Sequence, residues 1–414
     1  MSGLAPAEGI SIDSRTLRPG EVYYALRGER LDGHDFVEAA LAAGAGAAVV
    51  AAEQAGRWPQ WAERLRPVPD PLAALQQQAR ARRLAWGGPL VAVTGSAGKT
   101  TTKEMIAAVL GTRLRVLKSE GNRNNHIGLP LTLLRLQAEH QVAVVEMGMN
   151  HAGEIARLAA IASPETGVFT NVAEAHLGNF ASLEAIAEAK RELARGIAPG
   201  GRLVLNRDDA RVARFGEGFA GTVVFYSGSD HAAPLRYPGR HNRANAAAAV
   251  ATGGLFGVER AAAEAALAEL EPPPGRGQQL RRGGMTLIHD CYNANPAAMA
   301  AMLGVLAETP GTRRVAVLGE MRELGAASAA LHRQVGEAAA RSGVNALLAV
   351  GGDAQWILEG ARAAGFAGPA LFCESAAAAA AALPGWLRPG DTVLFKASRG
   401  LHLEEALAPL LHLP

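Results

Sequence analysis

The sequence predicts an α/β protein of three domains, with parallel sheets in its central and C-terminal parts. Its 414 residues exceed one ordinary domain of roughly 150 residues, so two or three separate cores are expected. Apolar runs of strand length alternate with helical stretches, as in parallel sheets that are covered on both faces. Turn-forming and proline-rich stretches divide the chain, and the expected domains are residues 1–87, 88–274 and 275–414.

The first expected domain has mixed α/β character and ends at the turn-forming stretch WGGP, residues 86–89. The central series of strands then begins with four apolar runs; they are PLVAVT from residue 89, QVAVVEM from 141, ETGVFTNV from 165 and GRLVLN from 201. Three successive prolines at 272–274 stop a helix and form a stiff linker. The second boundary is therefore placed near Pro274.

A second series of strands follows the linker and predicts a separate, Rossmann-like doubly wound domain. Its five runs are MTLIHDCY, RRVAVLGEM, NALLAVGG, PALFCES and DTVLFKAS. Helix-like segments such as residues 331–342 separate them. The alanine-rich run at 376–382 is interpreted as an ordinary helix, because alanine has the highest helix propensity.

Charge and composition exclude several classes of protein. The net charge is only +2, and the cluster of Arg80, Arg82 and Arg83 is short and lacks interleaved aromatic residues. Solvated helix faces explain such clusters better than a nucleic-acid surface does.

Two cysteines, Cys291 and Cys373, lie far apart and without metal-ligand spacing, which argues against disulfides and structural zinc. The N-terminus lacks the basic and apolar regions of a signal peptide, and the longest uncharged run, residues 39–52, is too short to span a bilayer. A soluble, cytoplasmic protein is expected.

The stretch VAVTGSAGKTTT, residues 91–102, is an apolar strand that leads through a glycine turn into a helix expected over residues 103–110. Backbone N–H groups at such a helix start hold phosphate oxygens, a lysine reaches the terminal phosphates and a threonine hydroxyl lies on Mg²⁺. The alternative is a glycine turn without a ligand. One departure is that Val93 occupies the expected first glycine position. The predicted phosphate loop comprises Gly95, Ser96, Ala97, Gly98, Lys99, Thr100 and Thr101.

This shortened loop ending in GKTT resembles that of the Mur ligases, the ATP-dependent amide ligases of peptidoglycan precursor synthesis, and of the related folylpolyglutamate synthases. The resemblance implies ATP as substrate and Mg²⁺, as two ions, as cofactor. A carboxylate is a poor target for an amine because its oxygen leaves badly. Transfer of the γ-phosphate of ATP to it forms an acyl phosphate that the amine can attack, with Lys99 beside the transferred group.

Two residues after neighbouring strands are candidates for metal binding. Glu146 ends the strand QVAVVEM, where an acid beside a phosphate loop can bind Mg²⁺, although a solvated strand end fits equally well. The segment TNVAEAHLGNF, with Asn171 and His176, resembles a Mur ligase segment whose histidine helps to hold a second metal ion. The resemblance therefore implies a metal role for His176, whereas a lone histidine would otherwise be interpreted as structural.

Lys190 lies within the apolar stripe of a helix expected over residues 182–197, not on its charged face. From the residues alone, a lysine that reaches to the rim of the core is the plainer interpretation. The resemblance implies another: Mur ligases carry here a lysine carbamylated by CO₂, whose carboxylate binds Mg²⁺. The implied metal ligands are Thr100, Glu146, His176 and Lys190 as a carbamate.

The stretch GRHNRANAAAA, residues 239–249, resembles the helix start that contacts adenine in these ligases, here through Asn242 and Asn245. Asparagine amides can pair with adenine, but they also cap helices, and both roles fit the sequence. Arg276 in the proline linker and Asp290 at the end of MTLIHD match family positions that close on phosphate and ribose. ATP would then lie between the second and third domains.

Residues 11–36 resemble the UDP-sugar-binding domain of the later Mur ligases, with Asp13, Ser14 and Arg15 as the element that meets the UDP moiety. Folylpolyglutamate synthases lack that domain, which weakens this alternative. Another Mur-type ligase that adds a single amino acid is the nearest alternative. A nucleotide-driven switch is a different class, and it would hydrolyse ATP without any carboxylate and amine pair.

Further segments resemble the family member that joins D-alanyl-D-alanine to UDP-N-acetylmuramoyl-tripeptide; they are GNRNNHIGLPLTLL at 121–134, DCYNANPAAM at 290–299, VLGEMRELG at 317–325 and FKASRG at 395–400. The implied substrate contacts come from Asn124, Asn125, Lys396 and Arg399. The sister enzyme that adds the third amino acid carries an Asp-Asn-Pro motif, and this sequence contains none. Ala397 stands where the family usually has glycine in KGSR, and Arg123 and His126 flank the asparagine pair. A monomer is expected.

Overall fold

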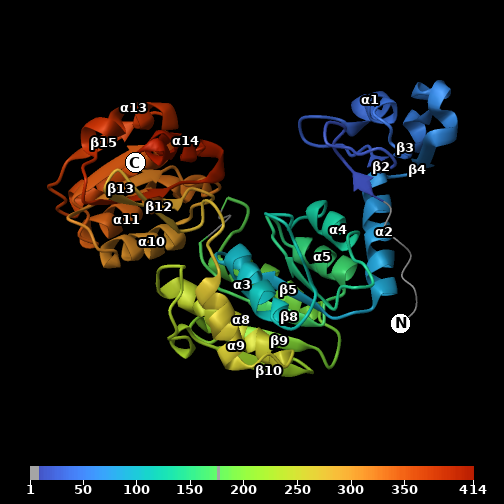
Figure 1. Ribbon diagram of the computed structural model, residues 1–414, viewed down its shortest axis with the longest axis horizontal. Coiled ribbons are helices and arrows are strands. Elements are labelled where there is room, and N and C mark those ends of the chain that lie inside the picture. Colours follow the sequence, from blue (N-terminus) through green and yellow to red (C-terminus); the bar gives the residue numbers. More distant parts are fainter. Residues whose placement is uncertain (1–8, 175–177) are drawn as a thin grey trace.

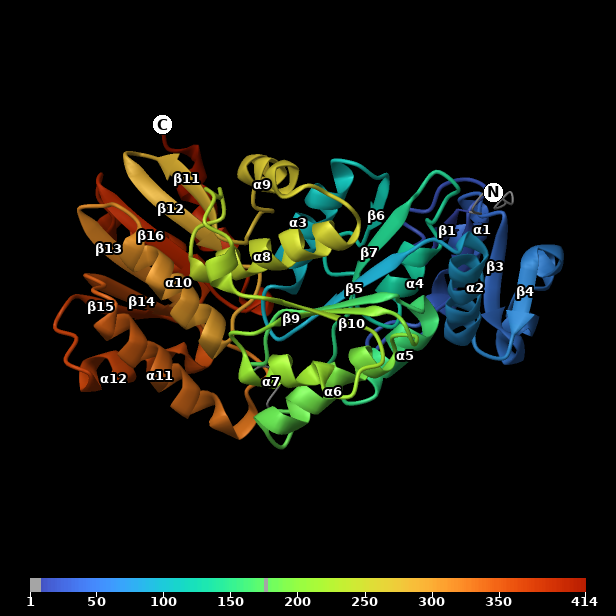
Figure 2. The ribbon, with the colours of Figure 1, turned by 90° about the horizontal axis from the view of Figure 1, so that it is seen from below.

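The structure, a computed structural model, describes residues 9–174 and 178–414 of the chain. Its three sheets belong to three units that lie in a row, with the central unit in the middle (Figures 1 and 2). The prediction of an α/β protein with three units and parallel sheets is confirmed. Within the described ranges, no helix is both long enough and apolar enough to cross a membrane.

The first unit has a parallel four-stranded sheet in the order β1-β2-β3-β4. Its elements are β1 (Ile10–Ser11), β2 (Val22–Tyr24), α1 (Val37–Ala42), β3 (Ala47–Ala51) and β4 (Leu65–Val68). The uncharged run at 39–52 thus supplies the end of α1 and the buried strand β3. Its apolar character reflects the core of this unit.

The long helix α2 (Pro71–Trp86) connects the first unit to the central one and packs beside α5 (Glu154–Ala162) (Figure 1). Arg80 and Arg83 donate hydrogen bonds to carbonyl groups in the last turn of α5, where the helix dipole favours cations. Arg83 is 2% exposed and its guanidinium lies 2.7 Å from the carboxylate of Glu165. The prediction of solvated helix faces is therefore wrong for Arg83, which anchors the two units.

The central unit has six parallel strands in the order β10-β9-β8-β5-β7-β6. They are β5 (Leu90–Thr94), β6 (Val116–Lys118), β7 (Val142–Glu146), β8 (Thr166–Phe169), β9 (Arg202–Asn206) and β10 (Thr222–Tyr226). The four runs predicted as strands are β5, β7, β8 and β9. Because β5 lies between β7 and β8, the connections after β5 and β7 leave toward opposite edges. Ligands of open α/β sheets bind outside the strand ends at such a switch point.

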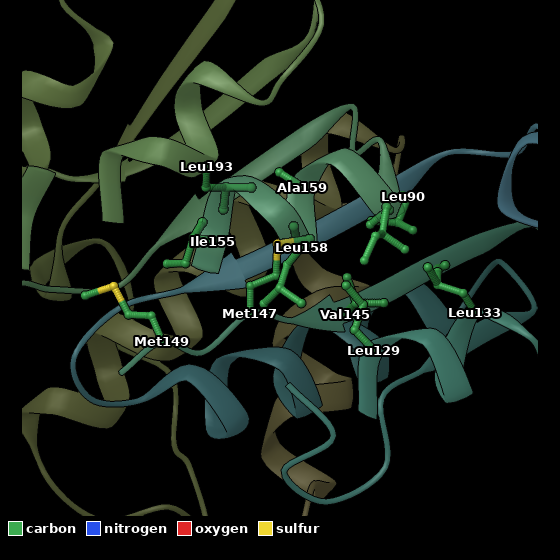
Figure 3. Close-up of a cluster of buried hydrophobic side chains, with 14 of the residues drawn as sticks. Leu90, Leu129, Leu133, Val145, Met147, Met149, Ile155, Leu158, Ala159 and Leu193 are labelled. Carbon is green, nitrogen blue, oxygen red and sulfur yellow. The ribbon is translucent and has the colours of Figure 1, made fainter. Parts of the chain in front are cut away.

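Helices cover both faces of the central sheet. On one face lie α3 (Lys99–Gly111), α8 (Arg240–Leu255) and α9 (Arg260–Glu269), and on the other α4 (Gly128–Leu133), α5 and α6 (Leu183–Arg195); α7 (Ala210–Ala213) is a single turn. Figure 3 shows the second face, where Leu129 of α4, Leu158 of α5 and Leu193 of α6 pack over Leu90 and Val145 of the sheet. Burial on both faces explains why these strands are continuous apolar runs.

The C-terminal unit has a six-stranded sheet in the order β11-β12-β16-β13-β14-β15, with only β11 antiparallel to its neighbour. The strands are β11 (Gln278–Arg282), β12 (Met285–Asp290), β13 (Arg313–Gly319), β14 (Ala346–Val350), β15 (Ala370–Cys373) and β16 (Asp391–Lys396). The helices are α10 (Pro296–Glu308), α11 (Ser328–Arg341) and α12 (Gln355–Ala363) on one face, and α13 (Ala376–Trp386) and α14 (Glu404–Leu407) on the other. The predicted doubly wound architecture is confirmed. The polar edge strand β11 was not predicted.

Candidate active site

The turn between β5 and α3 lies at the switch point of the central sheet and contains two glycines with positive φ, Gly95 (152°) and Gly98 (79°). A Cβ at Gly95 would lie 1.8 Å from Oγ1 of Thr170, and one at Gly98 would lie 2.7 Å from Oδ1 of Asn245. Both the backbone conformation and the neighbouring side chains therefore require glycine. The residues predicted as a phosphate loop form this strand-turn-helix, and α3 begins at Lys99.

The segment after β8 holds the first half of this loop. The N–H of Ser96 donates to the carbonyl oxygen of Asn171, and the N–H of Ala97 donates to Oδ1 of the same asparagine, both at 2.9 Å. Oγ of Ser96 donates to the carbonyl of Ala173 and accepts from its N–H, again at 2.9 Å. The first intrahelical bond of α3 is donated by Thr102, so the N–H groups at the helix start have no intrahelical acceptor. They form the part of the loop suited to an anion.

Lys99 opens α3 and folds back over the loop, with Nζ 2.8 Å from the carbonyl oxygen of Gly95. Its pKa is lowered chiefly by burial, a shift that the carboxylate of Glu146 opposes and the guanidinium of Arg276 reinforces. Arg276 of the linker and Glu146 at the end of β7 thus shift the pKa of the same lysine, in opposite directions. A partly buried ammonium in this position is favoured by additional negative charge, which phosphate groups would supply.

Glu146, at the end of β7, is 2% exposed and meets the loop directly. Oε2 accepts a 2.6 Å hydrogen bond from Oγ1 of Thr100, and Oε1 accepts a 2.7 Å bond from Nδ2 of Asn124. The alternative of a solvated strand end is therefore wrong. Carboxylate and hydroxyl oxygens are donors that Mg²⁺ prefers, so Thr100 and Glu146 fit this ion, and their metal role stays a prediction.

Lys190 lies on α6, which Ser182 caps by accepting from the N–H of Ala185. The side chain is 3% exposed, so the lysine does not reach to the rim of the core. No described carboxylate lies within ion-pair distance of it, and burial, followed by the charge of Lys99, holds its pKa well below the ordinary value. His176 lies outside the described residues.

Asn242 and Asn245 lie on α8 beneath the phosphate loop, 4% and 5% exposed. Nδ2 of Asn245 donates to Oδ1 of Asn242 at 3.0 Å, and Oδ1 of Asn245 accepts from Oγ1 of Thr102 at 3.1 Å. Gly239 occupies the N-cap position, and no side chain caps α8. The helix-cap alternative is therefore wrong for both asparagines. Their contact with adenine stays a prediction.

Two arginines, one from the linker and one from the C-terminal unit, lie close to the ring of Tyr292. Cζ of Arg276 lies 4.0 Å and Cζ of Arg399 6.0 Å from the ring centroid of Tyr292, which follows β12. Burial raises the pKa of Tyr292, and the charges of both arginines and Glu146 also act on it. The predicted nucleotide residue Arg276 and the predicted substrate residue Arg399 are thus joined through a tyrosine that the sequence analysis did not single out.

Asp290 and Lys396 end the adjacent parallel strands β12 and β16 and lie opposite each other in register. Nζ of Lys396 is 2.5 Å from Oδ2 of Asp290 and 2.9 Å from the carbonyl oxygen of Asn293. These two predicted site residues therefore pair with each other. Ala397, where the resemblance leads us to expect glycine, is buried. Its Cβ would lie 2.6 Å from a Cβ at Gly319, so glycine at 319 leaves room for the methyl group of Ala397.

The remaining predicted substrate residues lie in the other two units. Asn125 follows β6, and its Oδ1 accepts from the N–H of Ile127 and of Gly128 at the start of α4, at 3.2 and 2.8 Å. In the first unit, Arg15 donates to both carboxylate oxygens of Asp13, at 2.9 and 2.6 Å. These side-chain hydrogen bonds lower the pKa of Asp13 to about 2. Asp13, Ser14 and Arg15 lie between β1 and β2, in a different unit from the phosphate loop.

Three family models match the chain in order. They are described as the Mur ligase family catalytic domain at residues 6–83, the Mur ligase middle domain at 93–234 and the Mur ligase glutamate ligase domain at 275–399. Together they span the first, central and C-terminal units.

Similar proteins cover almost the whole chain. A protein of Synechocystis sp. named UDP-N-acetylmuramoyl-tripeptide--D-alanyl-D-alanine ligase is 39% identical over 426 residues, covering 97% of this chain and 91% of the relative. Its namesake in Escherichia coli is 40% identical over 375 residues, covering 83% and 81%. A crystal structure of MurF from Acinetobacter baumannii is 32% identical with a TM-score of 0.87, covering 98% and 93%. That of a MurF ligase from Thermotoga maritima in complex with ADP is 28% identical with a TM-score of 0.84, covering 99% and 98%.

Proposed function

The chain belongs to the Mur ligase family, and from this premise we propose that it joins D-alanyl-D-alanine to UDP-N-acetylmuramoyl-tripeptide, converting ATP to ADP and phosphate. The observation that carries the proposal is the meeting of Lys99, Thr100 and Glu146 at the carboxyl ends of β5 and β7. The proposal is supported by the names of relatives that cover nearly the whole chain. The reaction belongs to peptidoglycan precursor synthesis, and we assign it to a cytoplasmic monomer.

The first step transfers the γ-phosphoryl group of ATP to the terminal carboxylate of the tripeptide. A carboxylate oxygen forms a bond to phosphorus, and the bond from phosphorus to the ADP oxygen breaks. The N–H groups at the start of α3 and the ammonium of Lys99 would stabilise the charge on the transferred group. Because no carboxylate of the described residues lies in direct contact with Lys99, ATP would supply the anion that favours its charged form.

In the second step, the amine of D-alanyl-D-alanine attacks the carbonyl carbon of the acyl phosphate. The new C–N bond forms, phosphate leaves with the electron pair of the broken C–O bond, and the amine releases a proton to solvent. We place the nucleotide between the central and C-terminal units, near Arg276 and Asp290. The dipeptide would be bound by the C-terminal unit through Lys396 and Arg399.

Magnesium would be held by Thr100 and Glu146, and it would neutralise phosphate charge when bound. A second ion would involve His176 and Lys190. Lys190 is proposed to be a carbamate: its neutral amine adds to CO₂, forming an N–C bond and releasing one proton. The burial of Lys190 without a described carboxylate partner supports this proposal, because a carbamate replaces a buried cation by an anion that a metal ion can neutralise.

The UDP moiety is assigned to Asp13, Ser14 and Arg15, the phosphates of the precursor to Asn125, and a further contact with the precursor to Asn124. The precursor would therefore extend from the first unit to the phosphate loop.

The proposed function is tested by measuring phosphate release from ATP with each substrate omitted in turn. We expect turnover only with both UDP-N-acetylmuramoyl-tripeptide and D-alanyl-D-alanine, because the acyl phosphate forms on the first and only the second supplies the productive amine. Free glutamate should not replace the dipeptide. Turnover with a folate and glutamate, or equal use of a single amino acid, would contradict the proposal. Two precursors should be compared in this assay, one with lysine and one with diaminopimelate as the third residue of the tripeptide.

A further inference from the structure

We propose that Lys103 is a positioning residue that fixes the loop after β6, residues 119–125, against the helix that begins at the phosphate loop. The inference deepens the proposed function, because that loop carries the two asparagines assigned to the precursor. Lys103 lies one helical turn after Lys99 on α3 and is completely buried. A lysine without solvent contact requires acceptors for all three of its ammonium hydrogens.

The surroundings of Lys103 provide three acceptors. Nζ lies 2.5 Å from the carbonyl oxygen of Ser119, 3.2 Å from that of Gly121 and 3.1 Å from Oε1 of Glu104. The two carbonyls belong to the loop after β6, and Gly121 adopts a positive φ of 52° there. The ammonium of Lys103 therefore binds the backbone of the loop directly, through the carbonyl oxygens of Ser119 and Gly121.

The same loop is connected to the proposed metal ligand. Oγ of Ser119 accepts a 3.3 Å hydrogen bond from the N–H of Glu146, and Asn124 donates to the carboxylate of Glu146 at 2.7 Å. The carbonyl of Asn124 also accepts from the N–H of Gly148 at 2.9 Å. Lys103 holds the beginning of the loop and Glu146 holds its end. This arrangement orients Asn124 and Asn125 relative to the phosphate loop.

Lys118 offers a matched control for Lys103. It pairs with the same Glu104, but its side chain is 47% exposed and it forms no described hydrogen bond to the backbone of the loop. Lys103→Met removes the ammonium and retains most of the side-chain length, whereas Lys118→Met removes an ion pair with Glu104, whose side chain is 15% exposed, and no described contact to the loop backbone. Glu104 keeps Lys103 as a partner in Lys118→Met, and the loop keeps its own contacts, so this variant should change the KM for the precursor much less than Lys103→Met does.

The test measures the KM for UDP-N-acetylmuramoyl-tripeptide and the Kd for ADP per folded enzyme. Because hydrogen bonds to a charged group are worth roughly tenfold or more in an equilibrium, Lys103→Met should raise that KM by about tenfold. The Kd for ADP and the KM for D-alanyl-D-alanine should change by less than about twofold, because α3 and the C-terminal unit keep their own contacts. Proportional changes in all three constants, or an unchanged KM for the precursor, would overturn the inference.

Hydrogen exchange keeps the inference testable if Lys103→Met does not fold. In the unaltered protein without substrates, the amides of Ser119, Arg123 and Asn124, which donate to the carbonyl groups of Val144, Glu120 and Asn122, should exchange as slowly as the amide of Thr102 in α3. Fast exchange in that loop would refute the positioning role. Turnover of the unaltered enzyme with the two proposed substrates is measured first. Its absence would refute the proposed function, whereas turnover with an unaffected Lys103→Met variant would refute this inference alone.

Discussion

Replacement of Glu146 by glutamine and by alanine separates its proposed role as a metal ligand from its role in the fold. Glu146→Gln retains the size of the side chain and removes its charge. The glutamine oxygen can accept from Nδ2 of Asn124, and its amide can donate to Oγ1 of Thr100 after the hydroxyl rotates. Both contacts therefore survive as neutral hydrogen bonds.

Glu146→Ala removes both acceptors. Thr100 is only 5% exposed, and a buried donor without an acceptor costs about 1–3 kcal/mol. Asn124 is only partly buried and can turn to solvent, so the free energy of unfolding of the central unit should fall by about 1–3 kcal/mol in the alanine variant, and by about 1 kcal/mol in the glutamine variant. The two variants should differ in stability but not in their Mg²⁺ requirement, because both lack the carboxylate.

The assay is turnover as a function of Mg²⁺ concentration, accompanied by thermal unfolding. Loss of a residue that supports a metal ligand typically costs about 10–100-fold in affinity, so loss of a direct ligand should raise the half-saturating Mg²⁺ concentration at least as much in both variants. Ser119→Ala is a control, since it removes a 3.3 Å contact with the Glu146 backbone and no charge. An unchanged Mg²⁺ dependence in Glu146→Gln would refute the metal role.

Three further changes test the proposed chemistry. Lys99→Ala should abolish turnover while circular dichroism stays unchanged, because the lysine acts on the transferred phosphates; near-normal activity would refute the ATP assignment. Activity should fall when CO₂ and bicarbonate are removed and return when they are restored, and Lys190→Ala should be inactive. An unmodified Lys190 amine, detected by mass measurement in the fully active, metal-loaded enzyme, would exclude the carbamate. Arg276→Ala should raise the KM for ATP about tenfold or more because a charged contact to phosphate is lost, and unchanged ATP kinetics would contradict that contact.

The fold could be predicted in large part because its signals are local. Continuous apolar runs identified the buried parallel strands, and the glycine turn before Lys99 identified the phosphate loop. The polar strand β11 (Gln278–Arg282) lacks such a run, because an edge strand needs few buried side chains, and it escaped prediction. The anchoring role of Arg83 has no local signal, because its acceptors, Ala162 at the end of α5 and Glu165 after it, lie about 80 residues later in the chain.

The candidate site was predictable as a set of residues but not as a set of contacts. The pairing of Asp290 with Lys396 depends on two strands that are adjacent in the sheet and 106 residues apart in the chain. Tyr292 has no signal of its own in the sequence, because its contacts with Arg276 and Arg399 arise from the packing of separate segments. A charged residue in a helix start, such as Lys103, is normally solvated, so its complete burial had no signal in the sequence.

The structure also explains why a phosphate loop can lack the usual first glycine. Val93 is still part of β5: it pairs with Glu146 in the sheet, and its side chain is fully buried under α3 and α8. The turn therefore starts only at Gly95, and Asn171 occupies the N–H groups of Ser96 and Ala97. Because these two N–H groups are already bonded, the groups left to bind phosphate in this loop are the N–H groups at the start of α3 and the ammonium of Lys99. The segment after the neighbouring strand β8 therefore shapes the loop, which gives Asn171, two residues after the end of β8, a structural role.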